Sequence, residues 1–150
     1  MFFWFGALVM MASHLSQFGL VAWFTTHVGE ALTGVGWLWG TLGLTLAYFY
    51  SHYLFVSNTA HVSAMFAPFL AIALGLGAPP LPVALLLAAF SSIDACLTHY
   101  GTPSGPILFA SGEVSTGAWW RTGAVLSVVH IVLWLVLGTA WWRLVGLWSL

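Results

Sequence analysis

The chain carries too few charged side chains to cover the surface of a water-soluble protein. Charged residues make up 3% of its 150 residues, whereas a soluble domain has about 25%. Hydrophobic residues make up 61%, and tryptophan, which favours the boundary between bilayer hydrocarbon and headgroups, occurs 10 times. We therefore predict an all-α integral membrane protein, because long apolar runs with few charges are typical of transmembrane helices.

The same composition argues against several classes of function. The net charge is -1, so the chain lacks the cluster of lysine and arginine that nucleic acid binding needs. The single Cys96 excludes an internal disulfide bond and a zinc site made of several cysteines. The chain has no Gly-x-Ser-x-Gly element of a serine hydrolase. We do not expect an enzyme.

Polar, glycine-rich and proline-rich stretches divide a single membrane domain, residues 1–150, into four parts. Residues 2–32 predict an apolar helix followed by a segment that either completes the span or lies at the membrane interface. A turn is predicted over residues 29–36. The last transmembrane helix is predicted over residues 119–143, because a Trp-Trp-Arg sequence stands at each end as an aromatic and basic anchor.

Two further apolar parts are each interrupted by a short polar stretch. Residues 36–76 have two short apolar arms around residues 57–59, which predicts a re-entrant helical hairpin, with one or two ordinary spans as the alternative. Residues 81–112 predict a helix that is broken at residues 101–104, where proline and glycine oppose a continuous helix. Backbone without helical hydrogen bonds inside a membrane must be buried in protein or face water. We therefore expect both breaks to face one shared, water-filled chamber.

Broken helices offer binding groups that carry no permanent charge. Free N–H groups at a helix N-terminus attract a carboxylate, while free carbonyl groups at a C-terminus can hold Na⁺ or another cation. Serine and threonine are also ordinary helix-packing residues in membranes. Two breaks of matching character in one chain favour a binding site near the middle of the membrane.

The sequence Ser57-Asn58-Thr59 resembles the Ser-Asn-Thr signature of the divalent anion:sodium symporter family of dicarboxylate and citrate carriers. The surrounding sequence resembles the branch that exchanges citrate or 2-oxoglutarate and malate, and the match runs in order from about residue 2 to the C-terminus. The stretches that carry this resemblance are residues 50–55, 60–62, 98–102, 109–112 and 119–121. The resemblance implies that the chain is the C-terminal portion, with the second of two inverted repeats, of such a carrier.

The resemblance also implies roles for individual residues. The implied substrate-binding residues are Ser57, Asn58, Thr59, Thr102 and Pro103. The resemblance places Asn58, Gly101 and Thr102 at a cation site. His61, His99 and Asp94 are further candidates for a cation or fixed-charge site, because they lie near the breaks or within an apolar stretch. The family often has an asparagine after its Thr-Pro break, whereas this chain has Ser104-Gly105, which weakens the case for Na⁺. The exchanger branch uses fixed positive groups instead, and His61 and His99 are the candidates.

Asp94 lies within an apolar stretch, and a carboxylate inside a membrane is a functional candidate by default. It could be protonated, pair with a histidine, or bind a coupling H⁺ or Na⁺. A structural role is equally open, because a carboxylate in an anion pathway would repel the substrate.

We predict secondary transport of citrate-, malate- or 2-oxoglutarate-type anions by a multi-pass protein of a bacterial inner membrane. The expected partners are the lipid bilayer, the carboxylate substrate and either the missing N-terminal repeat or a partner chain, with a homodimer as one arrangement. We expect no cofactor beyond Na⁺ or H⁺ coupling and no other metal. The alternatives are a non-transporting fragment or structural membrane subunit and a haem-binding subunit that uses His14 and His27.

Overall fold

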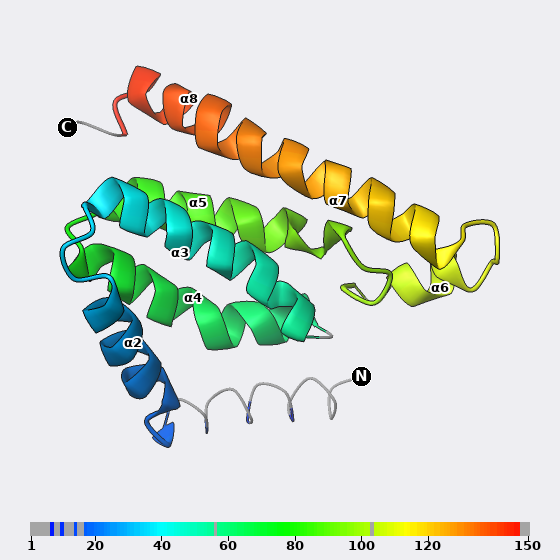
Figure 1. The fold of residues 1–150 in the computed structure, drawn as a ribbon, viewed down its shortest axis with the longest axis horizontal. Helices are drawn as coiled ribbons and strands as arrows, with labels where there is room; N and C mark the ends of the chain where they lie inside the picture. Colours follow the sequence, from blue (N-terminus) through cyan, green and yellow to red (C-terminus); the bar gives the residue numbers. More distant parts are fainter. Residues whose placement is uncertain are drawn as a thin grey trace.

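The structure, a computed structural model, describes residues 7, 10, 14, 17–55, 57–102 and 104–147, and these residues form helices joined by short turns, with no strand among them (Figure 1). The predicted all-α architecture is therefore confirmed for this part of the chain. The elements in chain order are α2 (Leu20–Ala31), α3 (Trp37–Ser51), η1 (His52–Leu54), α4 (Asn58–Gly75), α5 (Pro80–Ile93), η2 (Asp94–Cys96), α6 (Gly105–Phe109), α7 (Thr116–Leu133), η3 (Trp134–Gly138) and α8 (Thr139–Leu144). The segments η1 and η2 are 3₁₀ turns, and η3 is a π-helical turn.

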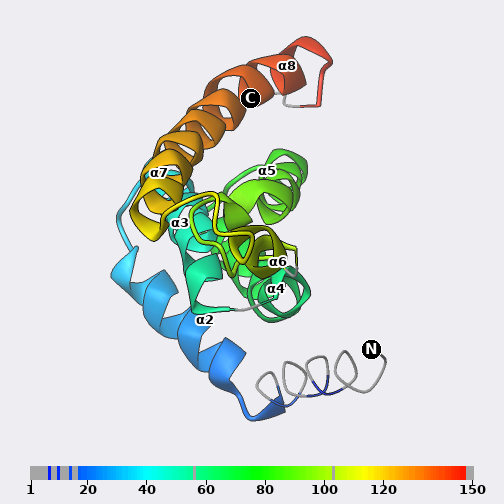
Figure 2. The same cartoon turned by 90° about the vertical axis from the view of Figure 1, so that its right-hand side faces the viewer.

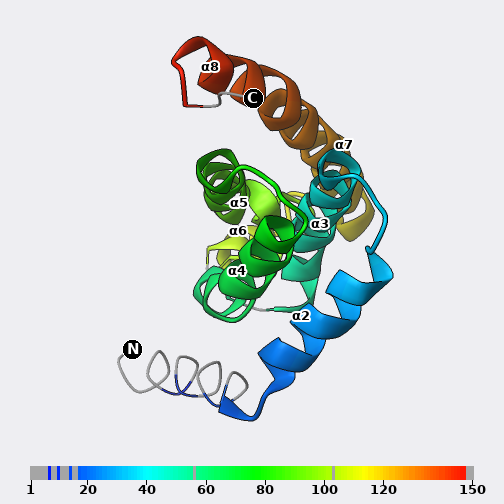
Figure 3. The same ribbon diagram turned by 90° about the vertical axis from the view of Figure 1, so that its left-hand side faces the viewer.

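Helices α3, α4 and α5 pack side by side and form the centre of the molecule (Figure 1). The chain runs along α3, returns along α4 and runs forward again along α5, so that η1 and η2 lie at the same end. Figures 2 and 3 show α2 and the α7–α8 helix on the outside of this group. The arrangement places the two segments that interrupt the helices next to each other.

Aromatic side chains hold the three central helices together. Tyr48 and Phe49 of α3 are fully buried. The Tyr48 ring lies 5.5 Å from that of Phe69 on α4, and the Phe49 ring lies 5.3 Å from that of Phe90 on α5. Such edge-to-face pairs stabilise a packed interface beyond the area that they bury. The end of α3 near Tyr48 is thereby fixed against both neighbouring helices.

The last helix starts earlier than predicted. It begins at Thr116, because the Ser115 hydroxyl accepts a hydrogen bond from the backbone N–H of Ala118 at 3.3 Å and caps the first turn. It then continues without interruption through η3 to Leu144. Among the described residues, two helices are long and apolar enough to cross a membrane, Asn58–Gly75 and Thr116–Leu144. In the second of these only 17% of the most apolar stretch is buried, so most of its surface is left for lipid or for further protein.

The predicted turn over residues 29–36 was wrong at its start. Helix α2 continues to Ala31, and the carbonyl of Gly29 accepts hydrogen bonds from the Leu32 N–H and the Thr33 hydroxyl. The chain turns only near Gly34, which has a φ of 86° that favours glycine. Most of the apolar helix predicted at the start of residues 2–32 lies outside the described residues.

Candidate functional site

Helices are interrupted near both predicted positions. Helix α3 ends at Ser51 and is followed by η1, and Phe55 and Ser57 have extended conformations before α4 begins at Asn58. The first break therefore lies before the predicted residues 57–59, because Ser57 caps α4 and places Asn58 and Thr59 in its first turn. The second break is longer than predicted. Helix α5 ends at Ile93, and the residues described between it and the start of α6 at Gly105 form no helix longer than the η2 turn.

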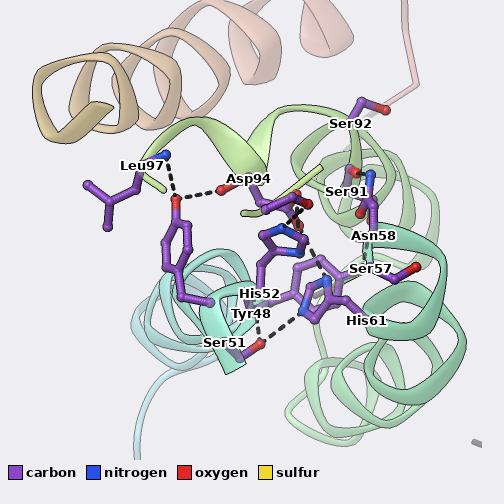
Figure 4. A network of polar contacts seen from close by, with 12 residues as sticks. Tyr48, Ser51, His52, Ser57, Asn58, His61, Ser91, Ser92, Asp94 and Leu97 are labelled. Atoms are coloured by element: carbon purple, nitrogen blue, oxygen red, sulfur yellow. Dashed lines mark hydrogen bonds and ion pairs between the residues drawn. The ribbon is translucent and has the colours of Figure 1, made fainter. Parts of the chain in front are cut away.

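The two breaks are joined by hydrogen bonds. The His52 Nε2 lies 3.0 Å from the carbonyl oxygen of Gly101, and the Asn58 side-chain amide donates to the carbonyl oxygen of Ser91 at 2.6 Å (Figure 4). The Tyr53 hydroxyl donates to the carbonyl oxygen of Asp94 at 2.5 Å and accepts from a backbone N–H at 3.2 Å. Side chains at the first break therefore bind backbone groups at the second break and at the adjoining end of α5.

Three buried side chains meet between the breaks. His52 comes from η1, His61 from the first turns of α4 and Asp94 from η2, and all three are fully buried. The His61 Nδ1 lies 3.3 Å from one carboxylate oxygen of Asp94, and the His52 Nδ1 lies 3.8 Å from the other. One ligand atom from each residue lies within 4.8 Å of those of the other two. Of the predicted cation-site residues, the structure brings together His61 and Asp94.

A second set of polar side chains supports this cluster from α3 and α5. The Ser51 hydroxyl donates to the carbonyl oxygen of Tyr48 at 2.8 Å and lies 3.0 Å from His61 Nε2. The Tyr48 hydroxyl bonds to the Ser91 hydroxyl at 2.6 Å, and its ring packs on the His61 ring. These contacts fix the orientation of the His61 ring.

The predicted substrate-binding residues lie at the edges of the breaks, where they are less buried. The Ser57 hydroxyl accepts from the Ala60 N–H and caps α4, and Thr59 is exposed. The Thr102 hydroxyl accepts from the Gly105 N–H at 3.2 Å. Pro103 lies outside the described residues.

His99 does not join the buried cluster. Its ring stacks on that of Phe109 in α6, with centroids 4.3 Å apart and planes 23° from parallel. Its Nδ1 is buried and has no hydrogen-bond partner. His61 and His99, which the sequence suggests as equivalent candidates, therefore have different surroundings.

His52 and the residues that support the cluster, Tyr48, Ser51, Tyr53 and Ser91, were not among the predicted site residues. One signal was available, because His52 and His61 stand on either side of residues 57–59. Asp94 and His61 were predicted to share one site, but nothing in the sequence indicated that His52 would lie against Asp94, more than 30 residues further along.

A cavity of about 460 Å³ lies elsewhere, between α3, α5 and the C-terminal helix. Its lining includes Thr41, Leu86 and Trp142 but no residue of either break. The water-filled chamber expected at the breaks is a different feature and stays a prediction.

These observations define a helical membrane protein whose helices are interrupted at two adjoining points. The transmembrane region of the sodium:sulfate symporter family matches residues 1–148. The chain belongs to this family, which confirms the resemblance drawn from residues 57–59 and their surroundings.

The relatives of the chain are named as carriers. It is 44% identical over 97% of its length to "Dicarboxylate transporter 1, chloroplastic" of Arabidopsis thaliana and 45% identical over 97% to "Putative malate transporter YflS" of Bacillus subtilis (strain 168). It is 32% identical over 93% to the "L-tartrate/succinate antiporter" of Escherichia coli (strain K12). The chain spans 26%, 30% and 29% of these proteins, respectively. At the level of the family, these names support transport across a membrane and not catalysis.

Proposed function

We propose that the chain forms part of a carrier that moves dicarboxylate or tricarboxylate anions across a membrane. The observation that carries the proposal is the direct contact between the two helix breaks, in a family whose named members transport carboxylates. Malate, succinate and tartrate are the first candidates, because relatives are named for them. Citrate and 2-oxoglutarate are the next candidate substrates.

The start of α4 provides the anion-binding groups. Helix α4 has 18 residues, so its N-terminus carries the positive end of a helix dipole and backbone N–H groups without helical partners. The side chains of Ser57, Asn58 and Thr59 are at this end, where a carboxylate could accept hydrogen bonds from them. Thr102 and Pro103 at the second break complete the proposed substrate site.

A coupling cation or a fixed positive charge is proposed for the neighbouring groups. The Asn58 side-chain oxygen is buried and has no hydrogen-bond partner, so it is free to act as a cation ligand. The carbonyl of Gly101 and the Thr102 hydroxyl lie across the break. His61, His99 and Asp94 are the groups nearby that can change their charge.

The carrier is proposed to be a multi-pass protein in which α3 and α4 form a re-entrant hairpin. Helix α4 alone is about 27 Å long, close to the thickness of the hydrocarbon core, so length does not distinguish a hairpin from two spans. Because the chain covers less than a third of its relatives, the site requires a second repeat from adjoining sequence or from a partner chain. A bacterial inner membrane and a homodimer are further proposals, and relatives include chloroplast proteins.

Transport of labelled malate into proteoliposomes tests this function. The protein is expressed with any sequence that adjoins the chain in its gene, and the Asn58→Ala variant is compared with the Ser92→Ala variant. A hydrogen bond to a charged group contributes about 1.5–3 kcal/mol, so Asn58→Ala is expected to lower uptake at limiting malate about 10- to 100-fold. Ser92 is exposed on α5 and points away from the breaks (Figure 4), so Ser92→Ala should transport normally.

Two outcomes would contradict the proposal. One is an absence of malate, succinate or citrate uptake by the folded protein, which would favour a structural membrane subunit. The other is equal uptake by the Asn58→Ala and Ser92→Ala variants. Replacing Na⁺ by choline in the same assay separates sodium coupling from exchange.

A further inference from the structure

In the cluster of His52, His61 and Asp94, four polar atoms have no hydrogen-bond partner and only long contacts with one another. The Nδ1 atoms of both histidines and both carboxylate oxygens of Asp94 are buried and form no hydrogen bond. All three residues have no exposed surface. A buried polar atom without a partner is costly, and a buried charge is costlier still. Four such atoms at one point call for a ligand that they share.

The surrounding hydrogen bonds determine which ring nitrogens carry protons. A backbone carbonyl can only accept, so the His52 Nε2 must donate to the carbonyl oxygen of Gly101. The Ser51 hydroxyl already donates to the Tyr48 carbonyl, so the oxygen of Ser51 accepts from His61 Nε2. In the neutral form of each ring, the Nδ1 atom therefore presents a lone pair to Asp94.

Two nitrogen lone pairs and a carboxylate repel one another unless a cation lies between them. A single proton can bridge Asp94 to only one of the two histidines. The separations of 3.3 Å and 3.8 Å also exceed the usual length of about 2.7–3.2 Å for an N–H···O hydrogen bond. The two separations are to different oxygens of Asp94, and one ligand atom from each residue lies within 4.8 Å of the other two. Ligands of a tetrahedral zinc ion with bonds of about 2.1 Å are about 3.4 Å apart, so binding an ion requires the three side chains to move slightly closer together.

The second contacts of the histidines match those of metal ligands. A metal-bound histidine usually donates its other ring N–H to a carbonyl, a carboxylate or water, and this contact fixes the ring. His52 donates to a carbonyl and His61 to a hydroxyl. Two imidazole nitrogens favour a transition metal over Na⁺, which prefers oxygen ligands.

We propose that His52, His61 and Asp94 bind one divalent transition metal ion, with Zn²⁺ as the best fit. The ion would connect His52 of η1 and His61 at the start of α4 to Asp94 of η2. It would thereby hold the two helix breaks together. Three protein ligands leave a fourth position for a further donor. The metal site uses none of the substrate groups at residues 57–59, but it shares His61 and Asp94 with the proposed cation or fixed-charge site. It does not depend on which anion the carrier transports.

The test is the metal content and affinity of the purified protein. The full protein is produced in detergent without a histidine tag, stripped with a chelator and titrated with Zn²⁺, and with Co²⁺ as a visible-absorbing substitute. The site variants are His61→Gln and Asp94→Asn, which keep side-chain size and hydrogen-bonding groups. The control is His27→Gln, because His27 is exposed on α2.

The expected result is one Zn²⁺ per chain in the wild type and the His27→Gln variant, with Co²⁺ absorption bands of a low-symmetry nitrogen and oxygen site. Changing a group that only supports a ligand already costs 10–100-fold in affinity, so each site variant should bind at least about 10-fold more weakly. Zn²⁺ should also raise the melting temperature of the wild type but not that of Asp94→Asn.

The wild-type titration decides the matter even if a site variant fails to fold. A folded wild type that retains no Zn²⁺ or Co²⁺ would overturn the proposal, as would equal binding by the folded Asp94→Asn variant. If the wild type binds no metal and Asp94→Asn is more stable, protons and not a metal bridge the cluster.

Discussion

At the scale of single residues, the second break is set by contacts across the chain and not by local sequence. Residues 94–97 follow a helical, apolar stretch, and their sequence predicts that the helix continues through them. Instead, the Tyr53 hydroxyl donates a hydrogen bond to the Asp94 carbonyl and accepts one from the Leu97 N–H. A helix through this region would use those groups itself. One tyrosine on η1 therefore ends α5 early and turns Asp94 toward the two histidines.

The Tyr53→Phe variant tests this role. It leaves the Asp94 carbonyl and the Leu97 N–H without a partner, and losing a partner at a buried polar group costs about 1–3 kcal/mol. We expect the free energy of unfolding in mixed detergent to fall by that amount. Tyr100→Phe is the control, since the structure gives the Tyr100 hydroxyl no hydrogen bond, and an equal effect of both changes would contradict the assignment.

At the scale of helices, close backbone contact holds α7 against η2. A Cβ atom at Gly123 would lie 2.5 Å from the Cys96 carbonyl oxygen and 2.6 Å from the Leu97 Cα. Both distances are too short for any side chain, so α7 can approach η2 only because this position is glycine. Gly123 therefore lets the last helix pack directly against the segment that carries Asp94.

The Gly123→Ala variant should separate α7 from η2. Overpacking of this kind costs about 1–3 kcal/mol. Cys96, the single cysteine, is half-buried beside Gly123, and its alkylation should become several-fold faster. Gly117→Ala in the same helix meets no atom within 4 Å and should leave the rate unchanged. If Cys96 is alkylated as slowly in the Gly123→Ala variant as in the Gly117→Ala variant, the contact at Gly123 does not hold α7 against η2.

Some features of the helices could be predicted from the sequence, and others could not. The first break was predictable, because Ser57-Asn58-Thr59 separates two apolar arms and serine is a strong helix cap. The start of the last helix was predicted at residue 119 because the Trp-Trp-Arg sequence was read as the membrane anchor. The capping role of Ser115, which starts the helix at Thr116, was not used. His61 and Asp94 were predicted to share a site, but the place of His52 beside them was not predictable, since periodicity within one helix does not indicate which residues of another segment face it.

At the scale of the whole molecule, the chain is less than a third of the length of the relatives that it matches. Its last helix leaves a row of apolar side chains exposed, among them Val125, Val128, Val132 and Val136. Lipid or the remainder of a carrier can cover this surface. The two breaks, by contrast, are packed together within the chain itself, so this part of the proposed site is already formed.

Protection of engineered cysteines by malate tests most directly whether both breaks face one anion site. In a Cys96→Ser background, Thr59→Cys and Thr102→Cys each place a thiol at one break, and Ala71→Cys places one about 20 Å further along α4. We expect malate to slow alkylation at both breaks with the same concentration dependence and to leave Ala71→Cys unaffected. Protection at only one break, or at neither, in a folded protein would contradict it.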